Sequence, residues 1–396
     1  MKNAIVMFFL FSAFSFIKGN ASILAIIDSG TDMNHEAISP FKWLNPVDTT
    51  INDRDEDGNG YQDDIYGWNF AESNNEVIDY SYLGLLDENI IKFFEIQAKM
   101  MINEATEEEI SWLRKMVSDG DFIKKLSVYG NFMHGTHVAG IGIKGVDTSK
   151  VLAVKLIPTE VKLPGSMLNQ KEEDETKFEL KDKLIKFALG QLAKQQMVLL
   201  TEIAEYVNGH KATVANGSFG TGYAQARMLI STVADSLNLK LTKEEIKKYS
   251  IYFINQLIEN GKNMVNSAPE TLFVFAAGND GSGNDEYPTS PANIRSTNVL
   301  TVSATIGYDG LAPFSNYGKL TVDVAAPGYA IEAAVPGNQY LKVSGTSQAA
   351  PYVANVAKTI ITLVVCSFLI IIGSVTKHNK FLGDNKLKVD MKNLGG

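Results

Sequence analysis

The sequence predicts an α/β fold in which a mostly parallel sheet carries helices on both faces. Two observations lead to this prediction. Short apolar runs, such as SILAII at 22–27 and TLFVFAA at 271–277, have the length and composition of buried strands. Segments with a helical pattern, such as 242–266, lie between runs of this kind, and strands that alternate with helices build parallel sheets.

The predicted elements follow one another in a regular order. A loop-rich acidic stretch at 46–75 separates the first strand from a helical region at about 80–129. A charged, helix-forming stretch follows at 171–208, and its first part fits a solvated insertion. The predicted strands are 22–27, 151–157, 212–215, 271–277, 299–304 and 321–325.

Three polar residues, Asp28, Ser218 and Asn279, each come just after a predicted strand. In open parallel sheets, the loops at the carboxyl ends of the strands form the functional site. The sequence therefore predicts that these three residues lie near one active centre.

Charge and cysteine content exclude some classes of protein. The chain has 396 residues, a formal net charge of −9 and no long basic run, which argues against nucleic acid as a partner. Cys366 is the only cysteine, so no disulfide can form within the chain. Stability outside the cell would then depend on packing or on a bound metal.

The first 21 residues have the pattern of a signal peptide. Lys2 precedes an apolar stretch at 4–17, and small residues at 19–21 offer a cleavage position. We expect 1–21 to direct export and 22–396 to form one domain that is secreted, periplasmic or held at the cell surface. A buried N-terminal strand or helix is the alternative.

Ser347, His134 and Asp28 form a candidate catalytic triad. The small neighbours of Ser347 (SGTSQAAP) leave its hydroxyl accessible, and the helical pattern from Ala349 puts it at or near a helix N-terminus. An N-cap role is the alternative. His134 (MHGTHVAG), expected at a helix start, titrates in the range of a base for serine. Asp28 can fix the imidazole tautomer.

The phrases DSGTD, HGTHVAG and GTSQAAP around these residues resemble those of the subtilisin-like (subtilase) family, and they occur in the family's order. The resemblance spans about 23–357. It implies a three-layer subtilisin-like fold, a triad of Asp28, His134 and Ser347, and a structural role for His137.

Two further phrases extend the resemblance. AAGND at 276–280 is similar to the family's oxyanion segment, which implies that Asn279 donates to the oxyanion. NGSFG at 216–220 resembles the strand that lines the primary pocket and pairs with an extended substrate. The substrate-binding residues implied by the resemblance are Ser218, Phe219, Gly220, Ala276, Ala277 and Gly278.

The acidic stretch DRDEDGNGYQDD at 53–64 resembles an EF-hand loop. It has oxygen donors at its first, third, fifth and twelfth positions and glycine at its sixth. This pattern predicts a structural calcium site, and bacterial-type subtilases carry a similar insert. A solvated acidic turn is the alternative. The predicted ligands are Asp53, Asp55, Asp57, Asn59 and Asp64.

The chain departs from the family pattern in three places. Asp28 follows the proposed cleavage site too closely for a propeptide. Three explanations remain open: a propeptide or chaperone that assists folding in trans, divergence of the gene, or an incomplete chain start. Insertions are expected at about 71–132 and 160–208, the first of them near the cleft. The apolar stretch 359–375 borders on the length of a membrane span. It begins only about 18 Å of helix beyond Ser347, so we favour a core role over membrane attachment.

The leading hypothesis is a secreted serine endopeptidase that cleaves protein or peptide substrates through an acyl-enzyme on Ser347. A degenerate subtilase-like protein that binds partners with little activity is one alternative. A calcium-dependent surface or adhesion module is another. Labelling of Ser347 by a serine-directed organophosphorus probe tests the enzyme hypothesis. Casein hydrolysis with and without a propeptide in trans tests the degenerate alternative, and the effect of EDTA on the melting temperature tests the calcium-dependent module.

Overall fold

The computed structural model describes residues 22–145, 149–160, 178–236, 239–307 and 310–362. One compact unit comprises residues 22–358. The predicted signal peptide, 1–21, lies outside the described residues, as does most of the apolar stretch 359–375. Within the described part, no helix is both long and apolar enough to cross a membrane.

The strands of the main sheet are β1 (Ser22–Asp28), β2 (Gly67–Asn69), β3 (Ser149–Lys155), β4 (Val214–Gly217), β5 (Leu272–Ala276), β6 (Val299–Ile306), β7 (Gly310–Leu311) and β8 (Val324–Pro327). Their order is β2-β3-β1-β4-β5-β6-β7, with β8 also paired to β6. Every pairing is parallel except that of β6 with β7. The prediction of a mostly parallel sheet is therefore confirmed.

All six predicted strands are present, with ends that differ from the prediction by up to three residues. The sequence did not predict β2 or β7, because each has too few residues to show a periodic pattern. It also missed an antiparallel hairpin of β9 (Ile331–Val335) and β10 (Gln339–Val343). Three of the five residues in β10 are exposed, so this strand has no continuous apolar run.

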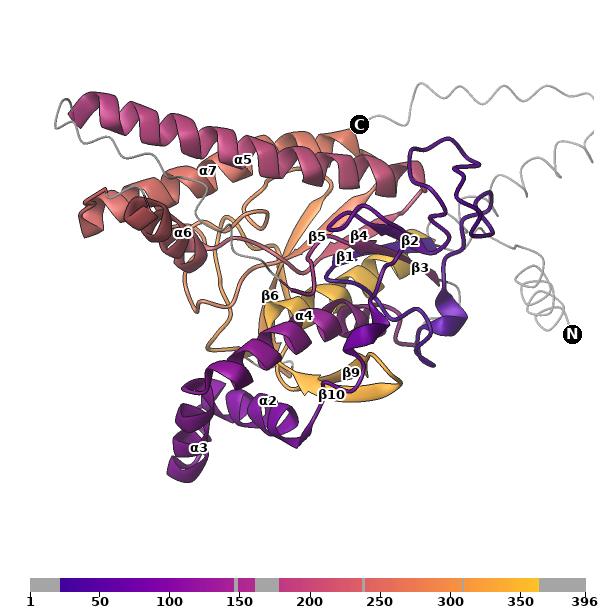
Figure 1. Cartoon of the computed structure of the whole chain (residues 1–396), viewed down its shortest axis with the longest axis horizontal. Coiled ribbons are helices and arrows are strands. Elements are labelled where there is room, and N and C mark those ends of the chain that lie inside the picture. Colours follow the sequence, from indigo (N-terminus) through magenta and orange to yellow (C-terminus); the bar gives the residue numbers. More distant parts are fainter. Residues whose placement is uncertain (1–21, 146–148, 161–177, 237–238, 308–309, 363–396) are drawn as a thin grey trace, which may run out of the picture. The chain divides into compact units, whose positions relative to one another are not determined.

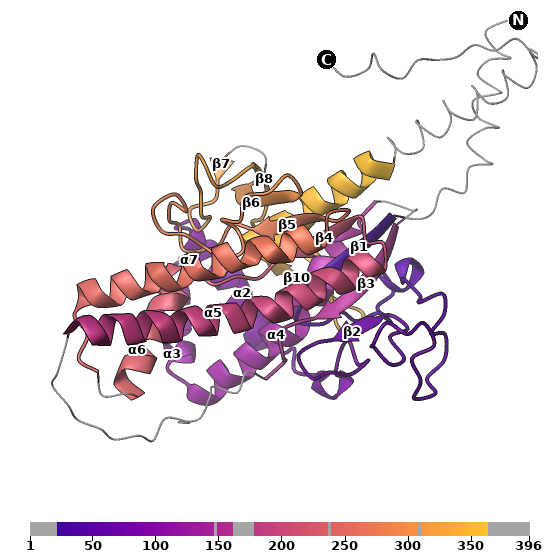
Figure 2. The same cartoon turned by 90° about the horizontal axis from the view of Figure 1, so that it is seen from above.

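Helices cover both faces of the sheet, as predicted. Figure 1 shows α5 and α7 on one face and α4 with the helix 346–362 on the other. Figure 2 shows that α5 and α7 run side by side. The helix bounds are α2 Glu88–Met101, α3 Glu107–Val117, α4 Gly120–Gly142, α5 Phe178–Gly209, α6 Tyr223–Ser236 and α7 Lys243–Ser267.

The structure corrects the position of His134 in its helix. We expected His134 at a helix start, but α4 begins at Gly120. Asp119 caps that earlier start, because its side chain accepts hydrogen bonds from the backbone N–H groups of Asp121 and Phe122 at 3.0 and 3.2 Å. The end of the predicted insertion 71–132 and the histidine therefore share one continuous helix.

Alternation along β1 directs Asp28 toward α4. Ala25 and Ile27 belong to a hydrophobic cluster that also contains buried residues of α5 and α7. Because successive side chains of a strand point to opposite faces, Leu24, Ile26 and Asp28 point to the other face. That face is the one that α4 covers (Figure 1).

Candidate active site

The pair formed by Asp28 and His134 is the centre of the candidate site. Asp28 is fully buried at the end of β1. Its Oδ1 atom accepts a hydrogen bond from His134 Nδ1 at 2.7 Å and another from the Ser29 backbone N–H at 2.8 Å. With Nδ1 used in this way, Nε2 is the imidazole nitrogen that can take up a proton.

Asp28 also sets the basicity of His134. Burial of the imidazole lowers the pKa of His134, but the charge and the hydrogen bond of Asp28 raise it and prevail, so the pKa lies above its ordinary value of 6.5. The carboxylate thus stabilises the protonated ring, which is the form that a general base adopts after it accepts a proton.

Glycines in α4 allow the helix to approach β1 closely. A Cβ atom at Gly135 would lie 2.2 Å from Gly30 O and 3.1 Å from Asp28 Cβ. Two turns later, on the same face of the helix, a Cβ atom at Gly142 would lie 2.7 Å from Leu24 Cδ2. A side chain at Gly135 would meet backbone and push the helix, and His134 with it, away from the strand, whereas one at Gly142 would have to displace the side chain of Leu24.

Ser347 lies in the first turn of the helix 346–362, as predicted. Its hydroxyl donates to Ser218 O at 3.2 Å, and the Ser218 hydroxyl donates to Ser347 O at 2.9 Å. These two bonds tie the start of the helix to the end of β4. His134 and Ser347 line one cleft of about 640 Å³. For proton transfer, the Ser347 hydroxyl has to turn from Ser218 O toward His134 Nε2.

Asn279 is oriented by the residue before the serine. Its Oδ1 atom accepts hydrogen bonds from Thr346 N at 2.8 Å and Thr346 Oγ1 at 3.0 Å. This arrangement leaves Nδ2 as the donor of an exposed side chain that lines the cleft. The backbone N–H of Ser347 belongs to the helix's first turn, where amides have no partner within the helix. Two donors are therefore available for one oxyanion.

The residues predicted to bind substrate divide into two groups. Those that line the cleft are Ser218, Phe219 and Gly220. Ala276, Ala277 and Gly278 do not belong to its described lining. The first two are buried, and Ala277 N donates to Val302 O of the neighbouring strand at 2.9 Å. Gly278 N donates to Thr346 Oγ1 at 3.1 Å, so this segment supports Asn279 and the serine turn from behind.

His137 has a different environment from His134. It is fully buried, and its Nε2 atom lies 3.0 Å from Leu341 O. Burial lowers the pKa of His137 to about 4, so the ring is neutral near pH 7 and donates this hydrogen bond. The contact holds β10 against α4, in keeping with the structural role that the resemblance implies.

Sequence reasoning missed a further set of residues in the cleft. They lie on α2 and α5, and no motif marks them, because their place depends on how two helices pack beside the triad. These cleft residues are Phe94, Gln97, Gln196, Met197, Leu199 and Leu200.

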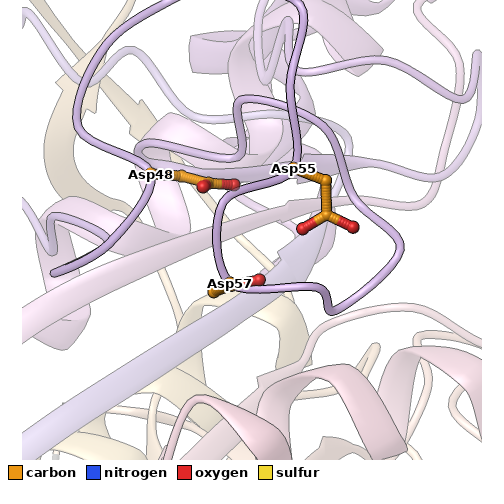
Figure 3. A group of neighbouring side chains, drawn as sticks. All are labelled: Asp48, Asp55 and Asp57. Carbon is orange, nitrogen blue, oxygen red and sulfur yellow. The ribbon is translucent and has the colours of Figure 1, made fainter.

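Three carboxylates converge in the acidic loop (Figure 3). Asp48, Asp55 and Asp57 each offer an oxygen, and these atoms lie within 4.8 Å of one another. Asp48 is fully buried; its Oδ1 atom accepts a hydrogen bond from Glu56 N at 2.7 Å, while Oδ2 has no hydrogen-bond partner among the described residues. Burial, with the nearby charge of Asp57, raises the pKa of Asp48 to about 6. A hard cation, bound by carboxylate oxygens at about 2.3–2.6 Å, fits this donor set.

Only part of the predicted ligand set joins this group. Asp55 and Asp57 belong to it, and Asp53 does not. The Nδ2 atom of Asn59 donates to Asp57 Oδ2 at 3.1 Å, so Asn59 supports a ligand. Asp48 was missed because it precedes the twelve-residue pattern and joins the others only when the loop folds back.

Asp64 fastens the acidic loop to α5. Its buried carboxylate accepts a hydrogen bond from the Tyr206 hydroxyl at 2.8 Å and lies 3.2 Å from His210 Nε2. Nearby in the loop, the Tyr61 hydroxyl donates to Glu202 Oε1 at 3.0 Å. Asp64 does not belong to the group of Asp48, Asp55 and Asp57, and its predicted role as the last ligand stays a prediction.

Comparisons with known proteins show which family the chain resembles. The model of the subtilase family (peptidase S8) matches residues 19–364. One segment of 98 residues is 46% identical to the thermophilic serine proteinase of Bacillus sp. (strain AK1), and it covers 24% of this chain and 23% of that protein. A match over 148 residues is 32% identical to subtilisin-like protease 2 of Plasmodium falciparum (isolate 3D7), covering 37% of this chain and 9% of that protein. The matched segments thus span about a quarter or less of these relatives.

Among solved structures, the crystal structure of a cold adapted subtilisin-like serine proteinase aligns with a TM-score of 0.44 at 19% identity, over 86% of this chain and 75% of that chain. The crystal structure of a lanthipeptide protease aligns with a TM-score of 0.45 at 16% identity, over 86% of this chain and 74% of that one.

Proposed function

Since the chain belongs to the subtilase family, we propose that it is a serine endopeptidase that hydrolyses protein or peptide substrates through an acyl-enzyme on Ser347. The observation that carries this proposal is the 2.7 Å hydrogen bond between Asp28 and His134 in the cleft that also contains Ser347. A buried carboxylate, an imidazole and an accessible serine hydroxyl are the three groups that nucleophilic hydrolysis needs.

The reaction follows from the roles of these groups. The Ser347 oxygen attacks the substrate carbonyl carbon while its proton passes to His134 Nε2. The carbonyl oxygen becomes negative and accepts hydrogen bonds from Asn279 Nδ2 and the Ser347 backbone N–H. The carbon–nitrogen bond then breaks, and His134 gives its proton to the leaving amine. Water, deprotonated by the same imidazole, hydrolyses the ester and restores Ser347.

An extended substrate can lie along the segment that follows β4. Ser218, Phe219 and Gly220 line the cleft beside Ser347, and a peptide that adds there as a strand gains backbone hydrogen bonds whatever its sequence.

Calcium is the cation we assign to Asp48, Asp55 and Asp57. Their oxygens are close enough to share one ion, and the buried Asp48 Oδ2 has no other described partner. Calcium bound there would offset the repulsion among three carboxylates and stabilise the loop. The predicted signal peptide at 1–21 supports export, to surroundings where calcium is abundant, of a peptidase domain comprising 22–396.

Hydrolysis of casein tests the proposed function. We expect purified protein to cleave casein, with or without a propeptide added in trans, and the Ser347→Ala variant to lose this activity. The matched control is Ser118→Ala, which removes an exposed hydroxyl at the end of α3 and should leave the rate unchanged. Equal rates for the wild type and Ser347→Ala would contradict the proposal.

A further inference from the structure

A buried asparagine, Asn316, binds the backbone on both sides of Asn279. Asn316 is fully buried. Its backbone N–H donates to Gly278 O at 2.9 Å, and its side-chain Oδ1 atom accepts a hydrogen bond from Asp280 N at 2.8 Å. The first bond holds the peptide group before Asn279, and the second holds the peptide group after it. Because the Cα atom of Asn279 joins these two planar groups, Asn316 fixes the point from which the side chain of Asn279 projects.

The side-chain amide of Asn316 occupies space that a glycine leaves free. Gly278 has a φ of +111°, and a Cβ atom there would lie 2.5 Å from Asn316 Nδ2. In this space, Asn316 Nδ2 donates to Ala277 O at 3.2 Å, and Oδ1 also accepts a hydrogen bond from Ser282 N at 3.2 Å. One side chain thus pairs with backbone groups at both ends of the loop from Ala277 to Ser282.

Asn316 is itself held by the sheet and by a second buried asparagine. The hydroxyl of Ser303 in β6 donates to Asn316 O at 2.6 Å. Asn284 is buried, accepts a hydrogen bond from Asn316 Nδ2 at 3.0 Å and donates through its own Nδ2 atom to Ala277 O at 2.9 Å. The loop that carries Asn279 therefore rests on a buried network, in which removal of one amide leaves its partners unsatisfied.

The side chain and the backbone of Asn279 have separate supports. Thr346 orients the side chain, whereas Asn316 holds the backbone. An oxyanion donor has to lie about 2.7–3.1 Å from the developing charge, and a displacement of about 1 Å can lower a rate by about 100-fold. Asn316 does not belong to the described lining of the cleft, so it can affect the reaction only through the groups that it holds.

We propose that Asn316, supported by Asn284, is a positioning residue of the oxyanion site, which places Asn279 for the transition state without contact to the substrate. This inference rests on the proposed function. It predicts that the effect of Asn316 on the rate depends on the presence of the Asn279 side chain.

A double-mutant cycle tests this dependence. We expect Asn316→Ala to lower kcat by about 10- to 100-fold and to leave KM nearly unchanged, because the oxyanion forms only after attack. In the Asn279→Ala background no side-chain donor is left to position. The same change should then lower kcat by about twofold or less. A merely structural role would give the same loss of kcat in both backgrounds.

The matched control is Asn298→Ala. Asn298 Nδ2 lies 2.9, 3.1 and 3.2 Å from the carbonyl oxygens of Val265, Ala268 and Thr271, so this change also removes hydrogen bonds to the backbone. Asn298 directly precedes β6 and thus lies at the amino end of a strand, whereas the site lies at the carboxyl ends. Its loss should lower the melting temperature and leave kcat unchanged in both backgrounds.

Equal losses of kcat from Asn316→Ala in the two backgrounds, or a loss confined to KM, would overturn the positioning role. If Asn316→Ala does not fold, Asn284→Ser replaces it and removes the second donor to Ala277 O. The same dependence on Asn279 is expected, and equal losses would again overturn the inference. A folded wild type that neither cleaves casein nor reacts with the organophosphorus probe would contradict the proposed function instead.

Discussion

His134 has to be neutral before it can take the proton of Ser347. Because Asp28 holds the pKa of His134 above 6.5, kcat/KM should rise with pH through a value above 6.5. Removing the charge by Asp28→Asn lets the pKa fall, so this acid limb should move to lower pH, while the rate falls by about 10⁴-fold. A pH–rate profile of both proteins measures this, and an acid limb at the same pH in both would contradict the assigned role of Asp28.

Asn279 is expected to act in the transition state alone. Asn279→Ala removes the Nδ2 donor, so kcat should fall by about 10²–10³-fold, a range that comes from the equivalent change in a subtilisin. KM should stay nearly constant, because the substrate carbonyl needs the donor only when it becomes negative. Steady-state kinetics on one peptide separates the two constants. A loss confined to KM would instead make Asn279 a residue of substrate binding.

Site residues could be predicted where the sequence immediately around them forms a recognisable motif, and they were missed where it does not. Asp28, His134 and Ser347 lie in short phrases whose small neighbours and order can be recognised along the chain. Asp48 has no such phrase. It meets Asp55 only because the loop folds back, which depends on contacts such as the bond from Glu56 N to Asp48 Oδ1.

At the scale of elements, the acidic loop is expected to depend on calcium. Chelation by EDTA should lower the melting temperature of the protein, because calcium at about 100 times its Kd contributes about 2.7 kcal/mol to stability. Asp48→Asn should lower the melting temperature in calcium and reduce the further effect of EDTA. The control, Asp235→Asn, changes an exposed aspartate of α6 and should respond to EDTA as the wild type does.

Two results would contradict this assignment. If EDTA leaves the melting temperature unchanged, the protein has no calcium site that stabilises its fold. If the Asp48→Asn protein is as sensitive to EDTA as the wild type, Asp48 is not a ligand of the calcium ion.

The start of α4 could not be predicted because its sequence contains several glycines. Gly130, Gly135 and Gly140 weaken a helical pattern when the sequence is considered alone. In the fold, the absence of a side chain at Gly135 is what allows contact with Gly30 at the end of β1. Close packing therefore outweighs local helix propensity here, and only the tertiary structure shows it.

At the scale of the whole molecule, the class of fold could be predicted because its strands are buried on both faces. Such strands, for example β1 and β5, appear as short apolar runs. The walls of the cleft could not be predicted in the same way. They come from α2 and α5, whose amphipathic sequences indicate helices but not the surface against which each helix packs.

Labelling of the purified protein by a serine-directed organophosphorus probe tests the central claim most directly, because it requires a folded chain, an activated Ser347 and an oxyanion site together. We expect one label per molecule on Ser347, no label on Ser347→Ala, and wild-type labelling of Ser118→Ala. Absence of the label from wild-type protein that is folded by circular dichroism would contradict the assignment of Asp28, His134 and Ser347 as a working triad.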